Sequence, residues 1–186
     1  GLAQSGTMSD LNHPGVLGVT SGGAAARHCD IQWSGLVNVL ALGGGALNCD
    51  YLINIPTIAT VGQDYLIRLG FSDTVGGSDF VNGVYFEYNR ATSLNWLIKT
   101  AATSTRTSTA TSTAAVTGWV KLSIQVNAAA TSVTYLINGS SVGTITTNIP
   151  TANGGFVMVV ASLAGGSNNV VYIDYFQVSQ TLTTAR

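Results

Sequence analysis

The chain has 186 residues, of which 46% are hydrophobic and only 8% are charged, with a formal net charge of -1. This length suits one domain with a substantial core, whereas the charged fraction lies far below the roughly 25% typical of globular chains. The near-neutral charge and the lack of a basic run argue against nucleic acid or an anionic membrane as partner, and no apolar run reaches the roughly 18 residues of a membrane span.

The two ends of the chain differ in pattern. Residues 1–13 are polar and show no periodicity, which predicts an N-terminal arm ahead of a single domain at 14–186. The opening GLAQSGTMSD has neither an initiator Met nor an apolar leader, so we expect it to be the trimmed start of a larger chain.

Short strands separated by turn residues are predicted along the first half of the domain. Gly43–Gly45 predicts a turn. Pro56 ends the predicted strand that precedes Pro56 in the sequence. The predicted strands are Val16–Thr20, Ala24–Gln32, Leu36–Leu42, Asn48–Ile55 and Asp64–Phe71.

The stretch Asn82–Thr100 predicts a hairpin, because the runs GVYFEYN and NWLIKT are joined by a polar turn. Strict alternation separates two faces of its first strand. One face carries Val84, Phe86 and Tyr88, and the other carries Tyr85, Glu87 and Asn89.

The second half continues this pattern. Thr recurs at every second position from 103 to 113, which favours an exposed Thr-faced strand over a disordered low-complexity segment. Asn138-Gly139 predicts a tight hairpin turn. The remaining strands are expected at Trp119–Val126, Ser132–Asn138, Ser141–Thr147, Phe156–Leu163 and Asn169–Ser179. About a dozen strands without a helical period predict an all-β sandwich or barrel.

Cysteine and acidic residues give weak signals for bonds or metals. Cys29 and Cys49 have no CxxC or zinc-ligand spacing, and free thiols are favoured over a disulfide. The Gly-rich loop Ser72–Asn82 offers oxygens from Asp73, Asp79 and Asn82. We expect no cofactor, with Ca²⁺ in this loop as the alternative.

Several phrases together resemble one fold family. They are HPGV (13–16), GFSD (70–73), GVYFEYN, NWLIKT, the run from 118 to 127, TTNIP (146–150) and YIDYFQV (172–178). In this order and spacing, residues 12–179 resemble a concanavalin A-like lectin/glucanase jelly roll, in the version found in phage tail-fibre and other virion surface proteins. The resemblance implies a sandwich of two antiparallel sheets, a face that often holds a glycan, and a homotrimer.

Glu87 is the only glutamate and therefore the first candidate for catalysis. Glycoside hydrolysis needs two carboxyl groups flanking one bond, and glucanases of this fold carry a Glu-x-Asp-x-x-Glu type motif. Here Tyr88, Asn89, Arg90 and Ala91 follow Glu87, so the partner acids are missing, and only Asp73 or Asp174 could supply one from elsewhere. A carboxylate held by Arg68 or Lys99 is the favoured interpretation.

A binding face is predicted from the side chains that point away from the core on alternating strands. Charged and amide groups pair with sugar hydroxyls, while aromatic rings stack on sugar rings. A ladder of cross-strand salt bridges is the alternative. The predicted ligand-binding residues are Arg68, Tyr85, Glu87, Asn89, Lys99, Trp119 and Lys121.

The expected function is therefore non-enzymatic. The chain is predicted to be a receptor-binding module of a phage tail fibre or tailspike on the virion surface, recognising host-surface carbohydrate beside other virion proteins. A capsid decoration or fibre-assembly domain without glycan binding is the alternative, and a glycan hydrolase is a third possibility.

Overall fold

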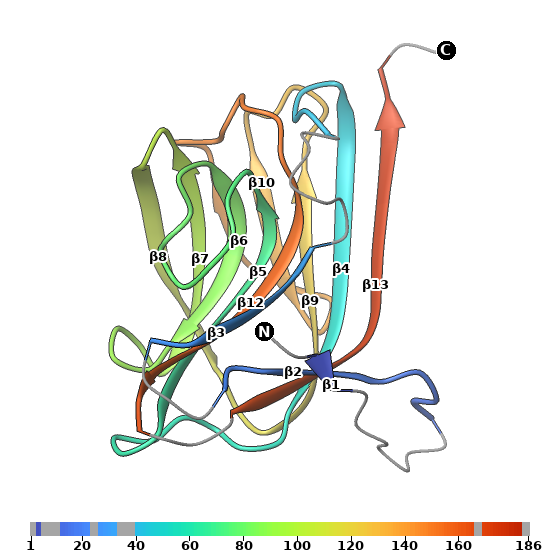
Figure 1. The fold of residues 1–186 in the computed structure, drawn as a ribbon. Helices are drawn as coiled ribbons and strands as arrows, with labels where there is room; N and C mark the ends of the chain where they lie inside the picture. Colours follow the sequence, from blue (N-terminus) through green and yellow to red (C-terminus); the bar gives the residue numbers. More distant parts are fainter. Residues whose placement is uncertain (1–2, 5–11, 23–25, 33–39, 166–168, 184–186) are drawn as a thin grey trace.

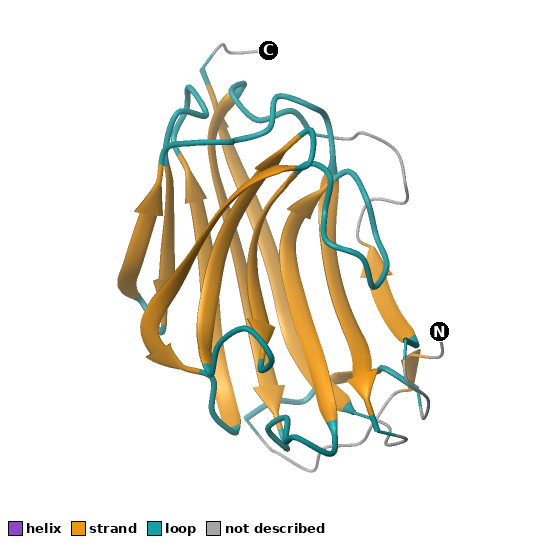
Figure 2. Cartoon of the chain, turned by 90° about the vertical axis from the view of Figure 1, so that its left-hand side faces the viewer, coloured by secondary structure: helices purple, strands orange, loops and turns teal. Residues whose placement is uncertain are grey.

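Two antiparallel sheets packed face to face make up the computed structural model, which describes residues 3–4, 12–22, 26–32, 40–165 and 169–183 (Figures 1 and 2). The seven-stranded sheet has the order β1-β2-β13-β4-β9-β10-β11, and the six-stranded sheet has the order β3-β12-β5-β6-β7-β8. The described ranges contain no helix, and so none that could span a membrane. The predicted all-β jelly-roll sandwich is confirmed.

Strand bounds follow the turn residues closely. The seven-stranded sheet contains β1 (Ala3–Gln4), β2 (Leu17–Thr20), β4 (Gly45–Ile55), β9 (Gly118–Val126), β10 (Val133–Ile137), β11 (Ser140–Ile145) and β13 (Val170–Leu182). The six-stranded sheet contains β3 (His28–Gln32), β5 (Asp64–Ser72), β6 (Gly83–Asn89), β7 (Asn95–Ala102), β8 (Thr105–Ala114) and β12 (Gly155–Ala164).

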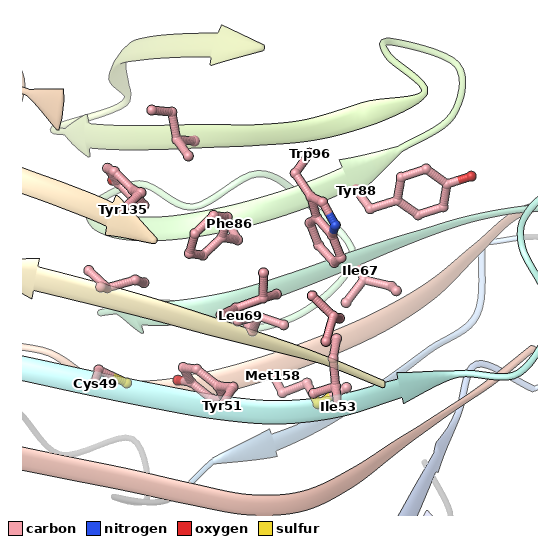
Figure 3. Close-up of a cluster of buried hydrophobic side chains, with 14 of the residues drawn as sticks. Cys49, Tyr51, Ile53, Ile67, Leu69, Phe86, Tyr88, Trp96, Tyr135 and Met158 are labelled. Carbon is pink, nitrogen blue, oxygen red and sulfur yellow. The ribbon is translucent and has the colours of Figure 1, made fainter. Parts of the chain in front are cut away.

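The core lies between the sheets, where the apolar side chains of alternating positions meet. Figure 3 shows Tyr51 and Ile53 of the seven-stranded sheet opposite Leu69 and Met158 of the six-stranded sheet. Phe86 meets Tyr135 edge to face across the layers, with ring centroids 5.2 Å apart. The sequence predicted this alternation. It places every second side chain of β5, β6 and β7 on the outer face of the six-stranded sheet.

Two predicted features can be checked directly at the hairpins. β6 and β7 pair antiparallel within Asn82–Thr100, and Asn138 and Gly139 turn with φ of 50° and 82° between β10 and β11. Both predictions are confirmed. At the second turn the backbone adopts positive φ, which Asn and Gly tolerate.

The Thr-rich stretch is ordered. It forms β8, which pairs with β7 in continuous register from Ala102↔Thr105 to Leu97↔Ala110. The disordered alternative is therefore wrong, and the expected Thr-faced strand is correct. Thr107 also hydrogen bonds Thr147 across the layers at 2.6 Å.

Two other expectations have different outcomes. Gly45 does not belong to the predicted turn but begins β4, where an added Cβ would lie 2.8 Å from Leu182 Cα. Of the predicted strand Leu36–Leu42, residues 36–39 lie outside the described residues, and Leu40 forms an isolated bridge with Gly154.

Within the predicted arm, β1 pairs with β2. Residues 5–11 lie outside the described part, so the division at residue 13 stays a prediction. Cys29 in β3 and Cys49 in β4 are free and buried, as expected, because they belong to different sheets.

Candidate functional site

The seven predicted ligand-binding residues lie on two different faces of the sandwich. Those of β5, β6 and β7 share the outer face of the six-stranded sheet, whereas Trp119 and Lys121 lie on the outer face of the seven-stranded sheet. The expectation of one continuous strip is wrong, because β9 pairs with β4 and β10 and not with the Glu87 strand. The first face holds Arg68, Tyr85, Glu87, Asn89 and Lys99.

A buried ion-pair cluster occupies the first face. Glu87 is 1% exposed, and its two carboxylate oxygens accept hydrogen bonds from Arg68 Nε at 2.5 Å and Lys99 Nζ at 2.7 Å. Register explains the geometry, since Arg68 is the cross-strand partner of Glu87, and Lys99 pairs with the neighbouring Tyr85. The favoured interpretation, a carboxylate held by Arg68 or Lys99, is confirmed, and the structure shows both contacts.

The loop 73–82 closes over this cluster, and we call it the strap. Arg68 Nη1 donates to the carbonyl oxygens of Gly77 and Ser78, both at 2.9 Å. The side chain of Phe80, itself a strap residue, is fully buried and packs against the Tyr85 ring, with centroids 4.7 Å apart. The strap therefore fills the outer face with its own backbone and one aromatic side chain.

Asp79 ties the strap to the sheet through its carboxylate. One oxygen accepts from the Tyr85 hydroxyl at 2.5 Å, and the other pairs with Arg106 Nε at 3.0 Å and Lys99 Nζ at 3.3 Å. Burial raises the pKa of Asp79, but the Tyr85 hydrogen bond and the charges of Arg68, Lys99 and Arg106 outweigh it, so that the pKa falls below its usual value. Burial and the hydrogen bond to Asp79 raise the pKa of the Tyr85 hydroxyl.

The acidic loop residues are engaged within the chain. Asp73 accepts hydrogen bonds from the backbone and side-chain nitrogens of Asn82 at 3.0 and 2.7 Å, while Asp79 faces three cations. No group of three or more His, Cys, Asp or Glu that could hold a metal is found among the described residues. The carboxylates of Asp73 and Asp79 are thus both bound by donors of the chain itself.

Asn89 lies at the end of the same face but has a local role. Its side-chain oxygen accepts from the Ala91 backbone at 3.1 Å, and its carbonyl accepts from Thr92 and Ser93. Asn89 therefore shapes the β6–β7 turn.

The second face is open by comparison. Lys121 Nζ lies 2.9 Å from Asp50 Oδ2, with side chains 40% and 26% exposed. The side-chain interaction with Asp50 raises the pKa of Lys121, and the nearby Tyr175 adds to this shift. Leu52 joins these residues in register, since it pairs with Lys121 on one side and Tyr175 on the other. We call Asp50, Trp119, Lys121 and Tyr175 the outer strip.

A β-bulge completes the second face beside Trp119. The register of β13 shifts between Ile173 and Tyr175, and the extra residue, Asp174, accepts a 2.7 Å hydrogen bond from His13 Nδ1. The His13 ring stacks on Trp119 with centroids 3.8 Å apart. Bulges commonly redirect a side chain in this way.

Sequence patterns could have found part of the outer strip. Asp50 alternates with Cys49 and Tyr51, which predicts an outward side chain, but nothing in the sequence placed its strand beside β9. Tyr175 was hidden by the bulge, because the extra residue breaks the alternation of β13. Asp174, in β13 of the seven-stranded sheet, accepts a hydrogen bond from His13. Asp73 accepts a hydrogen bond from Asn82. Neither carboxylate is therefore arranged as a second acid for Glu87.

A family model matches residues 12–174, described as the SO2946-like, C-terminal domain. The chain belongs to this family. No curated protein matches the SO2946-like domain in sequence.

Solved structures similar to this SO2946-like domain are lectin-type jelly rolls. The binding domain of botulinum neurotoxin DC, solved with rat synaptotagmin II, has a TM-score of 0.62 at 12% identity over 99% of this chain and 43% of that chain. The Emp46p carbohydrate recognition domain has a TM-score of 0.62 at 7% identity over 88% and 82%. Endo-beta-1,4-glucuronan lyase from the fungus Trichoderma reesei has a TM-score of 0.57 at 13% identity over 89% and 80%.

These identities establish the fold alone. The predicted concanavalin A-like lectin/glucanase jelly roll is confirmed. The chain spans less than half of the neurotoxin chain.

Proposed function

We propose that this SO2946-like domain is a non-enzymatic carbohydrate-binding module of a phage virion, in a tail fibre or tailspike, and that it binds host-surface glycan through the outer strip. The observation that carries the proposal is the outer strip itself, where the exposed Tyr175 and the half-buried Lys121 lie in one register row beside Asp50 and Trp119. An aromatic ring flanked by an ammonium and a carboxylate matches the apolar face and hydroxyl edge of a sugar.

Similar structures support the choice of carbohydrate. Emp46p is named for a carbohydrate recognition domain, and the fungal enzyme is named for cleaving glucuronan. The chain covers 82% and 80% of these two proteins. The virion location and the company of other virion proteins rest on the sequence phrases that resemble phage fibre and virion surface domains.

The state of Glu87 supports a module without catalysis. An acid or nucleophile must reach the scissile bond, but the Glu87 carboxylate is buried under the strap and both oxygens are bound to cations. A structural role in capsid decoration or fibre assembly is the second candidate, favoured by the way the strap closes the outer face of the six-stranded sheet.

A glycan array probed with the purified chain tests the first proposal. We expect binding to host-surface polysaccharide, and a loss of about tenfold in affinity for Tyr175→Ala or Lys121→Ala, since a stacking or charged contact contributes about 1–1.5 kcal/mol. Thr92→Ala, in an exposed turn of the other sheet, is the matched control.

Three outcomes separate the candidates. Equal binding by all variants would remove the outer strip as the site. No binding across host polysaccharides would leave the structural role. New reducing ends or unsaturated products after incubation with any bound polysaccharide would show that the module is an enzyme.

A further inference from the structure

One lateral edge of the six-stranded sheet is long and unpaired. β8 runs for ten residues and pairs only with β7 among the described strands; Figure 1 shows it at the rim of the molecule, farthest from β13. Every second backbone N–H and C=O of such a strand points outward without a partner in the sheet, which makes the edge a template for another strand.

The segment 105–110 of this edge lacks the usual protection against pairing. Proteins guard edges with Lys, Pro, bulges or short strands, yet β8 consists of Thr, Ser and Ala apart from Arg106. The Arg106 side chain turns back onto the chain, to Asp79 at 3.0 Å and to the Phe80 carbonyl at 2.7 Å. The neighbouring edge of the other sheet, β11, is also uncharged, with the sequence SSVGTI.

The opposite edge of the same sheet is guarded. The described part of β3 has five residues, and it carries His28 and Asp30 with side chains 3.7 Å apart. Asp30 also accepts a hydrogen bond from Gln32. The contrast within one sheet shows that the bare edge at β8 is not a consequence of the chain's low charge alone.

The exposed part of β8 is also held in a regular register and fixed against the second layer. Its register is regular from Thr105 to Ala110, and the bulge comes only beyond that point. Thr107 bonds Thr147 at 2.6 Å and Asn148 at 3.0 Å, which fixes the strand against the second layer. Pairing would therefore cost little ordering entropy.

We propose that a second copy of this chain pairs with β8, antiparallel and about a two-fold axis, so that the two six-stranded sheets become one. A two-fold contact requires a self-complementary surface. The side chains of Thr105–Ala110 other than Arg106 carry only hydroxyl and methyl groups, which can meet their like in an antiparallel register. The charge of Arg106 is paired with Asp79, so it neither selects a different partner nor repels the copy.

Sedimentation of the whole chain tests the inference, with variants that place one Lys on either side of the edge. Thr109→Lys and Ala110→Lys change exposed residues on opposite faces of β8. Gln125→Lys adds the same charge to an exposed position of β9, an interior strand of the other sheet. Far-ultraviolet circular dichroism and thermal unfolding confirm that each variant is folded.

We expect the parent chain and Gln125→Lys to sediment at twice the 19.1 kDa chain mass, and both β8 variants to dissociate to the monomer. Amide exchange in 105–110 is expected to be at least tenfold slower in the dimer than in folded Thr109→Lys. A monomeric parent, a trimer, or a dimer that survives both β8 substitutions would each overturn the pairing.

Discussion

Glu87 shows how one residue can be predicted in part from alternation. The alternation of side chains along β6 predicts that Glu87 points away from the core. The pairing of β6 with β5 and β7 then places Arg68 and Lys99 beside it. Its burial could not be predicted, because the strap comes from a Gly-rich loop whose path no periodicity describes. The predicted ligand face is therefore partly a closed ion-pair cluster.

Substitution of Glu87 by Gln should destabilise the fold. The change removes the anion that both Arg68 and Lys99 contact and leaves two buried cations under-compensated, which costs about 3 kcal/mol or more. Urea unfolding measures the free energy.

Asp50→Asn is the matched control for this substitution. It breaks the Asp50–Lys121 pair, whose side chains are 26% and 40% exposed, and such pairs contribute less than about 1 kcal/mol. Equal losses in the two variants would mean that the Glu87 cluster adds nothing beyond a surface pair.

At the level of the strands, the sequence predicted well where each strand lies along the chain, but it predicted poorly which strands lie side by side in a sheet. Each strand carries its own alternation, whereas β13 lies between β2 and β4 because of contacts more than a hundred residues apart in the chain. This is why Trp119 and Lys121 were assigned to the wrong sheet face. The bulge at Asp174 hid the outward position of Tyr175, since one extra residue reverses the faces of the strand.

The strap should make stability depend on acid pH. The folded-state pKa of Asp79 is lowered, so its contribution is fully present above its ordinary value of 3.8 and is lost as pH falls through the lower folded value. Unfolding free energies between about pH 2 and pH 6 should therefore fall toward the acid end more steeply in the parent than in Asp79→Asn.

Tyr85→Phe gives an independent check on this pH dependence. It removes the 2.5 Å hydrogen bond to Asp79 and keeps the ring against Phe80, so the slope should lie between those of the parent and Asp79→Asn. Identical slopes in all three proteins would show that the strap carboxylate does not contribute to acid stability.

At the level of the whole molecule, the two sheets enclose one main core that contains both thiols. Cys29 and Cys49 are 3% and 1% exposed, and burial raises the pKa of Cys49. Thiolate formation and access both limit alkylation, so labelling of Cys49 requires the sandwich to open. Reducing agent should leave stability unchanged, because there is no disulfide between the two.

Alkylation followed by mass spectrometry should therefore report global unfolding. We expect neither cysteine to react in the native protein at about pH 8, and both to react in denaturant. Gln125→Cys, at an exposed strand position, supplies a reactive thiol on the same fold. If Cys49 reacted in native protein as fast as this control, its part of the core would open locally, and the two sheets would not unfold as one unit.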